Sequence, residues 1–506
     1  MLGRAGGLAA ALLLTVFGGT AALAQGGPDV LPYPSYTYDF ETGKPLEAPL
    51  PYLPEKTLCW TDPQGVGLRE PSDFFITKQE TFVIADTGNN RIVEFSKDGA
   101  FLRELTSFYN STTFGEDTFN LPQGVFVTES GDLYVADTKN GRVVWFNSDW
   151  QVRRVFPAPV TEMIDSNAEY LPTRVACDSQ GRIFILAQNV NEGIVEIDQQ
   201  GKFVGFLGSA KVKVNMLDLF WRAVSTDAQR ERMTLFVPSE YNNFCLDEKG
   251  FIYCTTSAIS AEDLAQAAAS HSTDDRYAPV RRINPSGTDV LKRAGAYPPL
   301  GDLEDKSVFV DVAAREGGIY SVLDSGHGRI FTYDTNGSLL YAFGCTGDRV
   351  GTMKQPVALG CIGDTLYVLE KGGWIQSYRP TEYGDVLHAA ARAQAEGKNE
   401  AAYALWAQAL DYNHNLQLAF VEIGKSQLGQ NQYAQAMRSF KDGANRTWYS
   451  EAKKLQMREW MNTHFTLVFV LGAAAAVLLL LLIFRKRLNR WLFGWRAGKG
   501  QVDTIG

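Results

Sequence analysis

The sequence predicts a mainly β protein, a six-bladed β-propeller followed by an α-helical repeat segment and a single transmembrane helix. Three observations lead to this prediction. A unit of short strands and turns, clearest at Leu121–Phe146, recurs as far as Tyr378. Beyond Pro380 the apolar period changes from two residues to about 3.6. The stretch Phe465–Phe484 then runs for 20 residues without a charge.

The unit at Leu121–Phe146 contains three short strands. A Pro-x-Gly entry leads into Val125–Thr128, and a turn with glycine separates this strand from Leu133–Ala136. A polar loop, Asp137–Gly141, then precedes Val143–Phe146. Such even spacing favours a repeat array over a sandwich when the unit recurs.

The second strand of the unit recurs six times along the chain. Its central residues are Val83, Tyr134, Phe184, Tyr253, Tyr320 and Tyr367. Two intervals are longer than the others because they contain insertions, at Lys211–Met233 and Ser260–Tyr277. Both insertions are predicted as short helices, the second capped by Ser260.

Three of the units share the loop pattern Asp-x-x-Asn-x-Arg or a close variant of it. The phrases are ADTGNNRIVEF (Ala85–Phe95), ADTKNGRVVWF (Ala136–Phe146) and LDSGHGRIFTYDTNGSLLYAFG (Leu323–Gly344). They resemble NHL repeats, and the resemblance covers about Pro71–Tyr378. It implies a six-bladed NHL-type propeller with a general binding role. The other three units keep the strand pattern without the loop.

We expect a structural role for this loop. Asp86 and Asp137 are expected to accept hydrogen bonds from the backbone of the turn and from Arg91 and Arg142. A carboxylate and a guanidinium within one loop mostly satisfy each other. Ligand binding by the loop is the alternative.

Two segments precede the predicted propeller, which occupies residues 67–380. Residues 1–24 combine Arg4 with an apolar run and small residues at Ala22–Ala24, the pattern of a secretory signal peptide that is removed. Residues 25–66 are extended and rich in Pro and Tyr. This segment is a linker, packs along the propeller or supplies the strand that closes the ring.

Residues 381–460 have the pattern of paired helices. In Gly429–Phe440, small residues stand where helices meet closely and aromatic residues where they interlock. The segment resembles tetratricopeptide repeats, with related positions 34 residues apart. Only about two repeats fit, so we expect the helices to lean on the propeller or to continue into the next element.

Residues 465–484 form an apolar stretch long enough to span a bilayer. Cations follow it at once, and no comparable cluster precedes it, which places residues 485–506 in the cytoplasm. The predicted location is the cell membrane, with one span and the propeller and repeats outside. Gly472 and Ala476 predict packing against another membrane helix. The residues expected at the membrane interface are Arg485, Lys486, Arg487, Arg490, Trp491 and Trp495.

Charge and cysteine content narrow the function. The chain carries a net charge of −9, and without the signal peptide (+1) and the basic tail (+5) the remainder carries −15. Such an acidic part argues against nucleic acid as a partner. Six cysteines are too few for a disulfide scaffold. Cys245 with Cys254 and Cys345 with Cys361 are possible disulfides, and buried free thiols are the alternative.

The first strands of a propeller line its channel, so residues after each entry should ring the channel mouth. Counting back from the turns places apolar residues there in the last two blades, at Phe309–Val310 and Val357–Ala358. The polar half of the ring suits a small polar ligand, unless these groups bond to one another and to water. The candidate ligand-binding residues are Asp73, Gln123, Arg174, Asn242 and Asn243. Arg174→Ala is expected to remove ligand binding at little cost in stability.

No catalytic residue, metal ligand or cofactor is predicted. The alternative function is a metal-dependent propeller hydrolase resembling gluconolactonases, but Arg174 in the ring would repel the metal ion. Propellers resembling the peptide-amidating lyase hold zinc with several histidines, and the predicted propeller contains only His271 and His327.

The sequence therefore predicts a non-enzymatic, membrane-anchored, extracytoplasmic binding or scaffold protein. Its propeller and helical repeats are expected to bind a protein or a small polar ligand, such as a carbohydrate, within a membrane complex. A multi-pass protein such as a transporter is one candidate partner.

Overall fold

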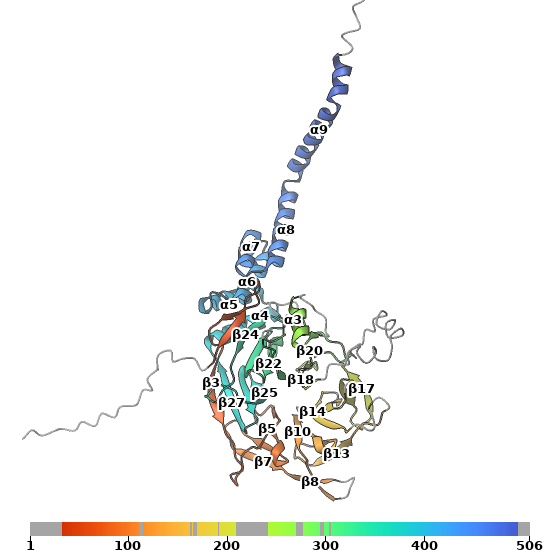
Figure 1. Ribbon diagram of the computed structural model, residues 1–506, viewed down its shortest axis with the longest axis vertical. Helices are drawn as coiled ribbons and strands as arrows, with labels where there is room; N and C mark the ends of the chain where they lie inside the picture. Colours follow the sequence, from red (N-terminus) through yellow and green to blue (C-terminus); the bar gives the residue numbers. More distant parts are fainter. Residues whose placement is uncertain are drawn as a thin grey trace, which may run out of the picture.

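The computed structural model of the protein describes residues 33–493, apart from 111–114, 162–163, 165–168, 191, 209–240, 270–276, 294–297 and 303–304. Six antiparallel sheets surround a central channel, and helices α4–α9 extend from the rim of this ring (Figure 1). The predicted fold class is confirmed: a six-bladed β-propeller, a helical segment and one apolar C-terminal helix. The predicted signal peptide and the insertion at Lys211–Met233 lie outside the described residues.

The strands of each blade follow one another from the channel outward and pair antiparallel. The first three blades are β4 (Asp73–Ile76), β5 (Phe82–Asp86), β6 (Arg91–Phe95) and β7 (Phe101–Leu105); β10 (Pro122–Val127), β11 (Leu133–Asp137), β12 (Arg142–Phe146) and β13 (Val152–Pro157); and β14 (Leu171–Cys177), β15 (Ile183–Gln188), β16 (Ile194–Ile197) and β17 (Phe203–Leu207). The last three are β18 (Asn243–Leu246), β19 (Ile252–Thr255) and β20 (Val280–Ile283); β21 (Phe309–Ala314), β22 (Tyr320–Asp324), β23 (Arg329–Tyr333) and β24 (Leu339–Phe343); and β25 (Pro356–Ile362), β26 (Thr365–Glu370) and β27 (Trp374–Pro380). All six predicted second strands are present.

The core is divided among the junctions between blades. A separate apolar cluster fills the space between each pair of neighbouring blades, including the last and the first. The middle strands are therefore covered on both faces, and every residue of β5 and β11 is buried. This packing explains why these strands read as unbroken apolar runs.

The Asp-x-x-Asn-x-Arg loops have a structural role and contain the expected bond between aspartate and arginine, but the backbone donor to each aspartate lies in the segment that enters the blade and not in the turn. The Asp86 carboxylate accepts hydrogen bonds from Arg91 Nε at 2.7 Å, Asn89 Nδ2 at 2.8 Å and the backbone N–H of Arg69 at 2.7 Å. Arg91 also donates from Nη1 to Asp62 at 2.6 Å. Each loop thus ties its hairpin to the segment that enters the blade.

The same bonds recur in the next blade. Asp137 accepts from Arg142 and Asn140, and Arg142 also pairs with Asp117. The arginine hydrogen bond holds the pKa of Asp117 at about 2, although burial alone would raise it.

The N-terminal segment both packs along the propeller and closes its ring. Strands β1 (Ser35–Tyr38) and β2 (Pro45–Glu47) extend the outer edge of blade 5 through β24. Strand β3 (Tyr52–Leu58) is the outermost strand of blade 6 and pairs antiparallel with β27, with Tyr52 opposite Pro380. The last blade is therefore completed by the beginning of the described chain.

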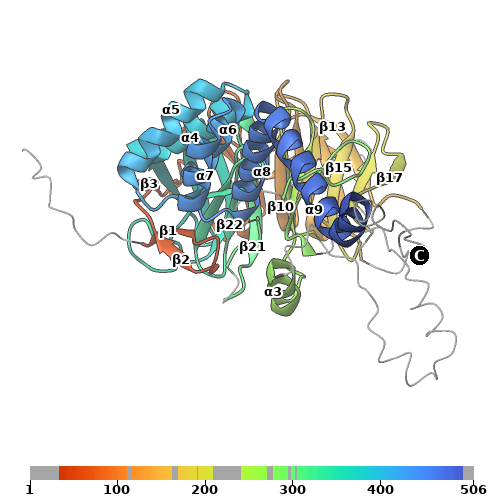
Figure 2. The same ribbon diagram turned by 90° about the horizontal axis from the view of Figure 1, so that it is seen from above.

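Helices cover the rim of blades 5 and 6 (Figures 1 and 2). They are α4 (Glu382–Ala395), α5 (Asn399–Tyr412), α6 (Gln417–Gly429), α7 (Tyr433–Asp442) and α8 (Arg446–Thr463), each packed on the next. A single apolar cluster combines buried residues of α4, α5 and α6 with those of blades 5 and 6, and a second, smaller cluster joins α6, α7 and α8. This agrees with the expectation that the helices lean on the propeller. The tetratricopeptide resemblance stays a prediction, although Gly424 lies against the Phe440 ring as the pattern requires.

A half-buried polar joint connects the propeller to α4. Asp364, in the turn between β25 and β26, accepts two hydrogen bonds from Arg392 of α4, at 2.9 and 2.5 Å. Arg315 of blade 5, whose side chain is only 1% exposed, lies 3.5 Å from the same carboxylate. Arg315 also donates to the Tyr52 hydroxyl at 2.9 Å. One carboxylate thus links blade 5, blade 6 and the first helix.

Helix α9 (Phe465–Phe493) continues α8 with only His464 between them. His464 N donates to Trp460 O at the end of α8, and His464 O accepts from Val468 N at the start of α9. The backbone of His464 itself is not helical, with φ −107° and ψ 17°. Among the described residues, Phe465–Arg487 is the one helix long and apolar enough to cross a membrane. Figures 1 and 2 show this rod leaving the rim of the propeller, not its channel.

Two smaller expectations concern an insertion and the cysteines. The second insertion contains a helix, α3 (Ala261–Ala269), and its Ser260 Oγ accepts a hydrogen bond from Asp263 N at 3.1 Å.

All six cysteines are free, so neither possible disulfide forms. Cys245 lies opposite Tyr253 and Cys254 opposite Phe244, which points the two thiols to opposite faces of blade 4.

The joint at Asp364 should be essential for stability. Asp364→Asn leaves Arg315 and Arg392 without their counter-charge, which we expect to lower the free energy of unfolding by about 3 kcal/mol. Burial raises the pKa of Asp364, but hydrogen bonds from Arg392 and nearby positive charges outweigh it and hold the pKa below 3.8. The stabilisation by this charge should therefore disappear as the pH falls below that value.

Thermal unfolding of the full chain in detergent measures this effect. Asp348→Asn is the matched control, because Asp348 forms only an exposed ion pair with Lys354 and should contribute less than about 1 kcal/mol. Equal melting temperatures for the two variants would contradict the role of the joint.

Candidate functional site

The first strands bring one residue from each blade to the same level of the channel. Each of these residues lies opposite the same position of its neighbouring second strand, the position that Ala85 occupies in blade 1 and Ala136 in blade 2. In blade order they are Asp73, Gly124, Arg174, Asn243, Asp311 and Ala358. The ring is thus polar in four blades and small in the other two.

Arg174 is the central group of this ring. It donates from Nε to Asn243 Oδ1 at 3.0 Å, from Nη2 to the carbonyl of Ser72 at 3.1 Å, and from Nη1 to the carbonyls of Gln123 and Thr173 at 3.0 and 2.9 Å. Its Nε also lies 3.9 Å from the Asp73 carboxylate. One guanidinium from blade 3 therefore touches blades 1, 2 and 4.

Asp73 and Asp311 connect neighbouring blades. Asp73 accepts from the backbone N–H of Val125 in blade 2 at 3.0 Å. Asp311 accepts in the same way from Leu359 in blade 6 at 2.6 Å. Between blades 2 and 3 the strands approach closely because Gly124 has no side chain. A Cβ on Gly124 would lie 2.5 Å from the Thr173 carbonyl oxygen, which is too close.

Burial perturbs both carboxyl groups. It raises the pKa of Asp311 to about 7, with a further contribution from the negative charge of Asp73. Burial also raises the pKa of Asp73, although Arg174 acts in the opposite direction. Two acids and one arginine thus share a largely buried site, in which burial places the pKa of Asp311 near neutral pH.

The other predicted ligand-binding residues have different surroundings. Asn243 is 2% exposed, and its Nδ2 has no hydrogen-bond partner among the described residues. Asn242 donates to the carbonyl of Phe309 at 2.6 Å and accepts from Thr255 Oγ1 at 2.6 Å. Gln123 contributes its backbone carbonyl to Arg174. The structure therefore brings Asp73, Arg174 and Asn243 together, while Asn242 bonds to blade 5.

The count back from the turn glycine misses Asp311 because the turn of blade 5 contains two glycines, Gly317 and Gly318. In blades 2, 3 and 4 the ring residue lies seven positions before the turn glycine, and the same count from Gly317 ends at Val310 instead of Asp311. The expectation of an apolar fifth blade is corrected to a carboxyl group at this position.

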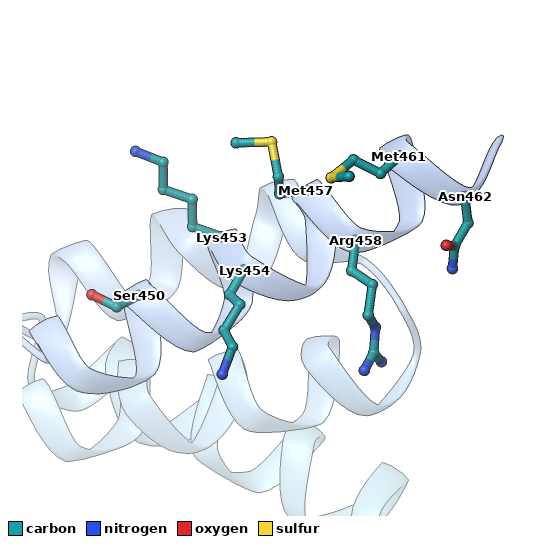
Figure 3. Close-up of a pocket in the computed structure, with 7 residues that line it drawn as sticks. All are labelled: Ser450, Lys453, Lys454, Met457, Arg458, Met461 and Asn462. Atoms are coloured by element: carbon teal, nitrogen blue, oxygen red, sulfur yellow. The ribbon is translucent and has the colours of Figure 1, made fainter. Parts of the chain in front are cut away.

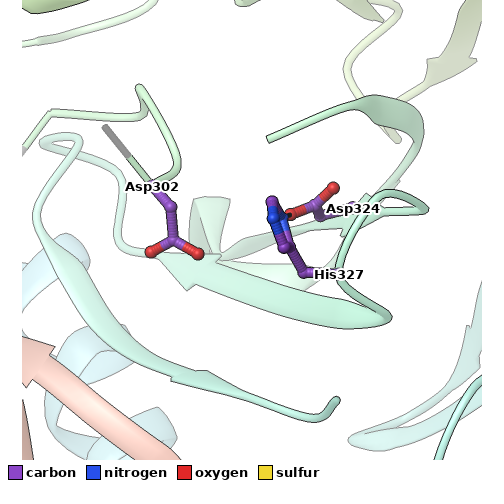
Figure 4. A group of neighbouring side chains, drawn as sticks. All are labelled: Asp302, Asp324 and His327. Atoms are coloured by element: carbon purple, nitrogen blue, oxygen red, sulfur yellow. Dashed lines mark hydrogen bonds and ion pairs between the residues drawn. The ribbon is translucent and has the colours of Figure 1, made fainter. Parts of the chain in front are cut away.

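A second acidic group lies in the loops of blade 5 (Figure 4). His327 replaces the loop asparagine, and its Nδ1 and Nε2 lie 2.9 Å from Asp324 and 2.8 Å from Asp305. Asp302 accepts hydrogen bonds from Arg329, Tyr36 and Tyr38. Asp302, Asp324 and His327 are close enough to share a metal ion, but Asp302 is already paired with a cation, as the acids are in the equivalent loops.

The predicted membrane residues lie on α9. Arg485, Lys486 and Arg487 are exposed at the end of the candidate span, and Gly472 and Ala476 are exposed within it. A Cβ on Gly472 would meet no atom within 4 Å. The side chains of Arg490 and Trp491, and all of Trp495, lie outside the described part of the chain.

Fold and sites together define a six-bladed β-propeller with NHL-type loops and an apolar helix at its C-terminal end. The model of the NHL repeat family matches residues 119–146, which include most of blade 2. No curated protein matches the sequence.

Solved structures with a similar arrangement include virginiamycin B lyase from Staphylococcus aureus, with 12% identity over 65% of this chain and 99% of that one and a TM-score of 0.39. A streptogramin B lyase has 10% identity over 65% of this chain and 98% of that one, with a TM-score of 0.40. The extracellular domain of a hybrid two-component system from Bacteroides thetaiotaomicron has 12% identity over 61% of this chain and 33% of that one, with a TM-score of 0.35.

The bonds of Arg174 change what we expect from its removal. Arg174→Ala removes the guanidinium donors to the Ser72 carbonyl, the Gln123 carbonyl and the Asn243 amide oxygen, although the last two keep donors in Ser72 Oγ and the backbone N–H of Phe244. It also removes the positive charge beside Asp73, so it should lower the free energy of unfolding by about 3 kcal/mol. Thermal unfolding of the full chain tests this, with the exposed Arg349→Ala as control. If the two variants have equal melting temperatures, Arg174 does not stabilise the fold and remains available to bind a ligand.

Asp311 should give the protein a measurable pH dependence. Its pKa is about 7 when folded and 3.8 ordinarily, so between these values the folded state holds a proton that the unfolded chain has lost. Stability from this group is full below about pH 4 and falls as the pH rises through about 7. In Asp311→Asn this slope should be absent.

The amide cannot accept from the N–H groups of both Val312 and Leu359, so the variant should be about 1 kcal/mol less stable near pH 5. Melting temperatures of both proteins from about pH 4.5 to 8 provide the comparison. Parallel curves would show that Asp311 does not titrate in this range.

Proposed function

We propose that the protein is a non-enzymatic, membrane-anchored binding protein that acts within a membrane complex. In this proposal α9 spans the cell membrane once, the propeller and helices α4–α8 lie outside, and residues 485–506 lie in the cytoplasm. The cations after the span support this orientation. The acidic charge of the outer part supports protein or neutral polar ligands over nucleic acid.

One observation carries the proposal: the propeller is joined to the apolar helix through packed elements. Blades 5 and 6 share one apolar cluster with α4, α5 and α6, Asp364 binds Arg392, and α8 continues into α9. A flexible linker would only keep a propeller near the membrane. Packed helices instead fix which surfaces face a neighbour in the same membrane.

The channel supports a binding role less strongly than its ring of polar residues suggested. Arg174 donates most of its hydrogen bonds to acceptors within the protein. The groups left for a small polar ligand, such as a sugar, are the Asn243 amide and the free lone pairs of Asp73 and Asp311. We therefore propose proteins of the membrane complex, such as a transporter, as the main partners.

Crosslinking of the intact chain in its own membrane tests the proposal. We expect a multi-pass membrane protein that reproducibly crosslinks to both the helices and the propeller. Absence of any reproducible partner would refute it. Stoichiometric calcium or zinc in the purified outer part would instead favour the alternative, a metal-dependent propeller hydrolase.

The span itself should contribute to this complex. Gly472→Ile with Ala476→Ile fills the exposed small-residue strip while the helix stays apolar, so membrane insertion should be unchanged. Co-purification of the membrane partner should fall several-fold, because close helix approach needs small residues. Leu471→Ile with Val477→Ile is the control. If both double variants retain the partner equally, the span is only an anchor.

A further inference from the structure

Helix α8 presents an exposed face just outside the candidate membrane span. Met457 and Met461 are 54% and 48% exposed, and they line an open hollow together with Lys453, Lys454 and Arg458 (Figure 3). These residues follow one another at helical spacing, so they share one side of α8. Ala452, on the opposite side, is fully buried against α7.

We propose that this face of α8 is a docking surface for an acidic, partly apolar segment of a neighbouring membrane protein, close to where that protein enters the bilayer. The inference rests on the proposed function, since it takes α9 as a membrane span. We call Lys453, Lys454, Met457, Arg458 and Met461 the α8 face.

Charge indicates the kind of partner. The α8 face carries three cations, and Lys454 has a carboxylate nearby in Glu451, at 3.5 Å in an exposed pair. Among the described residues, no carboxylate lies within ion-pair distance of Lys453 or Arg458. Carboxylates of a partner would supply the missing charge, and methionines adapt to apolar side chains of varied shape.

Two other occupants fit less well. A second copy of this chain, parallel in the same membrane, would bring Lys454 and Arg458 against their own copies, and like charges repel. Lipid headgroups lie too low. At about 1.5 Å per residue, Arg458 is about 10 Å and Lys453 about 18 Å above Phe465, whereas the headgroup layer is only about 5–8 Å thick.

The α8 face lies close to the packing strip of the span. Only His464, whose backbone is not helical (φ −107°, ψ 17°), separates α8 from α9. Met461 precedes Gly472 by 11 residues, which is about 16 Å at about 1.5 Å per residue. A neighbouring protein that packs on Gly472 and Ala476 is therefore within reach of the α8 face.

Site-specific photocrosslinking in the full chain and its own membrane tests the proposal. A photoreactive residue at Met457 should crosslink to a second protein, and the same residue at Thr463, on the opposite side of α8, should not. The crosslinked peptide should be rich in Asp or Glu and adjacent to a membrane span. An adduct with a second copy of this chain, an adduct with lipid only, or no adduct would overturn the proposal.

Charge reversal provides the second arm. Lys453→Glu, Lys454→Glu and Arg458→Glu together should lower the adduct yield about tenfold or more, because facing like charges cost at least about 1.4 kcal/mol. Lys202→Glu, Lys249→Glu and Lys371→Glu make the same change in net charge at exposed sites on the propeller and should leave the yield unchanged. Replacing the partner's carboxylates by lysine should restore the adduct with the reversed face.

The melting temperature of each variant shows that it is folded. If the membrane partner still co-purifies but Met457 gives no adduct, the α8 face is excluded while the proposed function survives. If no membrane partner co-purifies with the unchanged protein, the proposed function itself fails.

Discussion

The fold depends on the strand that closes the ring. A propeller has no free sheet edge within its core only when its last blade is completed, and here β3 supplies the fourth strand of blade 6. Tyr52 begins this strand, is fully buried and stacks on Phe343 of blade 5. Its hydroxyl donates to the Asp364 carbonyl and accepts from Arg315. Closure of the ring and attachment of the helices therefore meet at one side chain, so loosening either would disturb the other.

Most of the buried arginines described above lie where one blade meets another or where the propeller meets the helices. Arg91 and Arg142 tie loops to the entries of their blades, Arg174 ties four blades at the channel, and Arg315 with Arg392 ties the helices to blade 6. A buried guanidinium is costly unless its donors are satisfied. Carboxylates, hydroxyls and backbone carbonyls satisfy most of these donors, while Nε of Arg315 and of Arg392 has no partner among the described residues. The buried arginines therefore offer little to a ligand, so exposed residues are the better candidates for a binding surface.

The repeat pattern was enough to predict the blades, because each second strand is covered on both faces and reads as an apolar run between turns. The bonds from Arg91 to Asp86 and from Arg142 to Asp137 are predictable as well, since both partners lie within the same motif. Their outer acids, Asp62 and Asp117, come from preceding segments without a fixed spacing, and no local pattern identifies them. Asp311 is not found by counting because the turn of blade 5 contains two glycines, Gly317 and Gly318, and only pairing between the strands shows which residue lies opposite Leu323. Pairing between distant strands also decides the role of β3, so the sequence leaves several roles open for the N-terminal segment.

The position of the rod has a consequence for how the propeller meets other proteins. Because α8 and α9 leave the rim and lie across the direction of the channel (Figures 1 and 2), a membrane around α9 would hold the disc on its edge. Both channel mouths would then open parallel to the membrane surface, and the hairpin β8 (Ser107–Asn110) and β9 (Gly115–Thr118) would lie far from it. A propeller that lies flat presents one face to the membrane and one to the outside. A propeller that stands on its edge presents both broad faces to lateral neighbours, the arrangement expected of a component that assembles with other proteins of the same membrane.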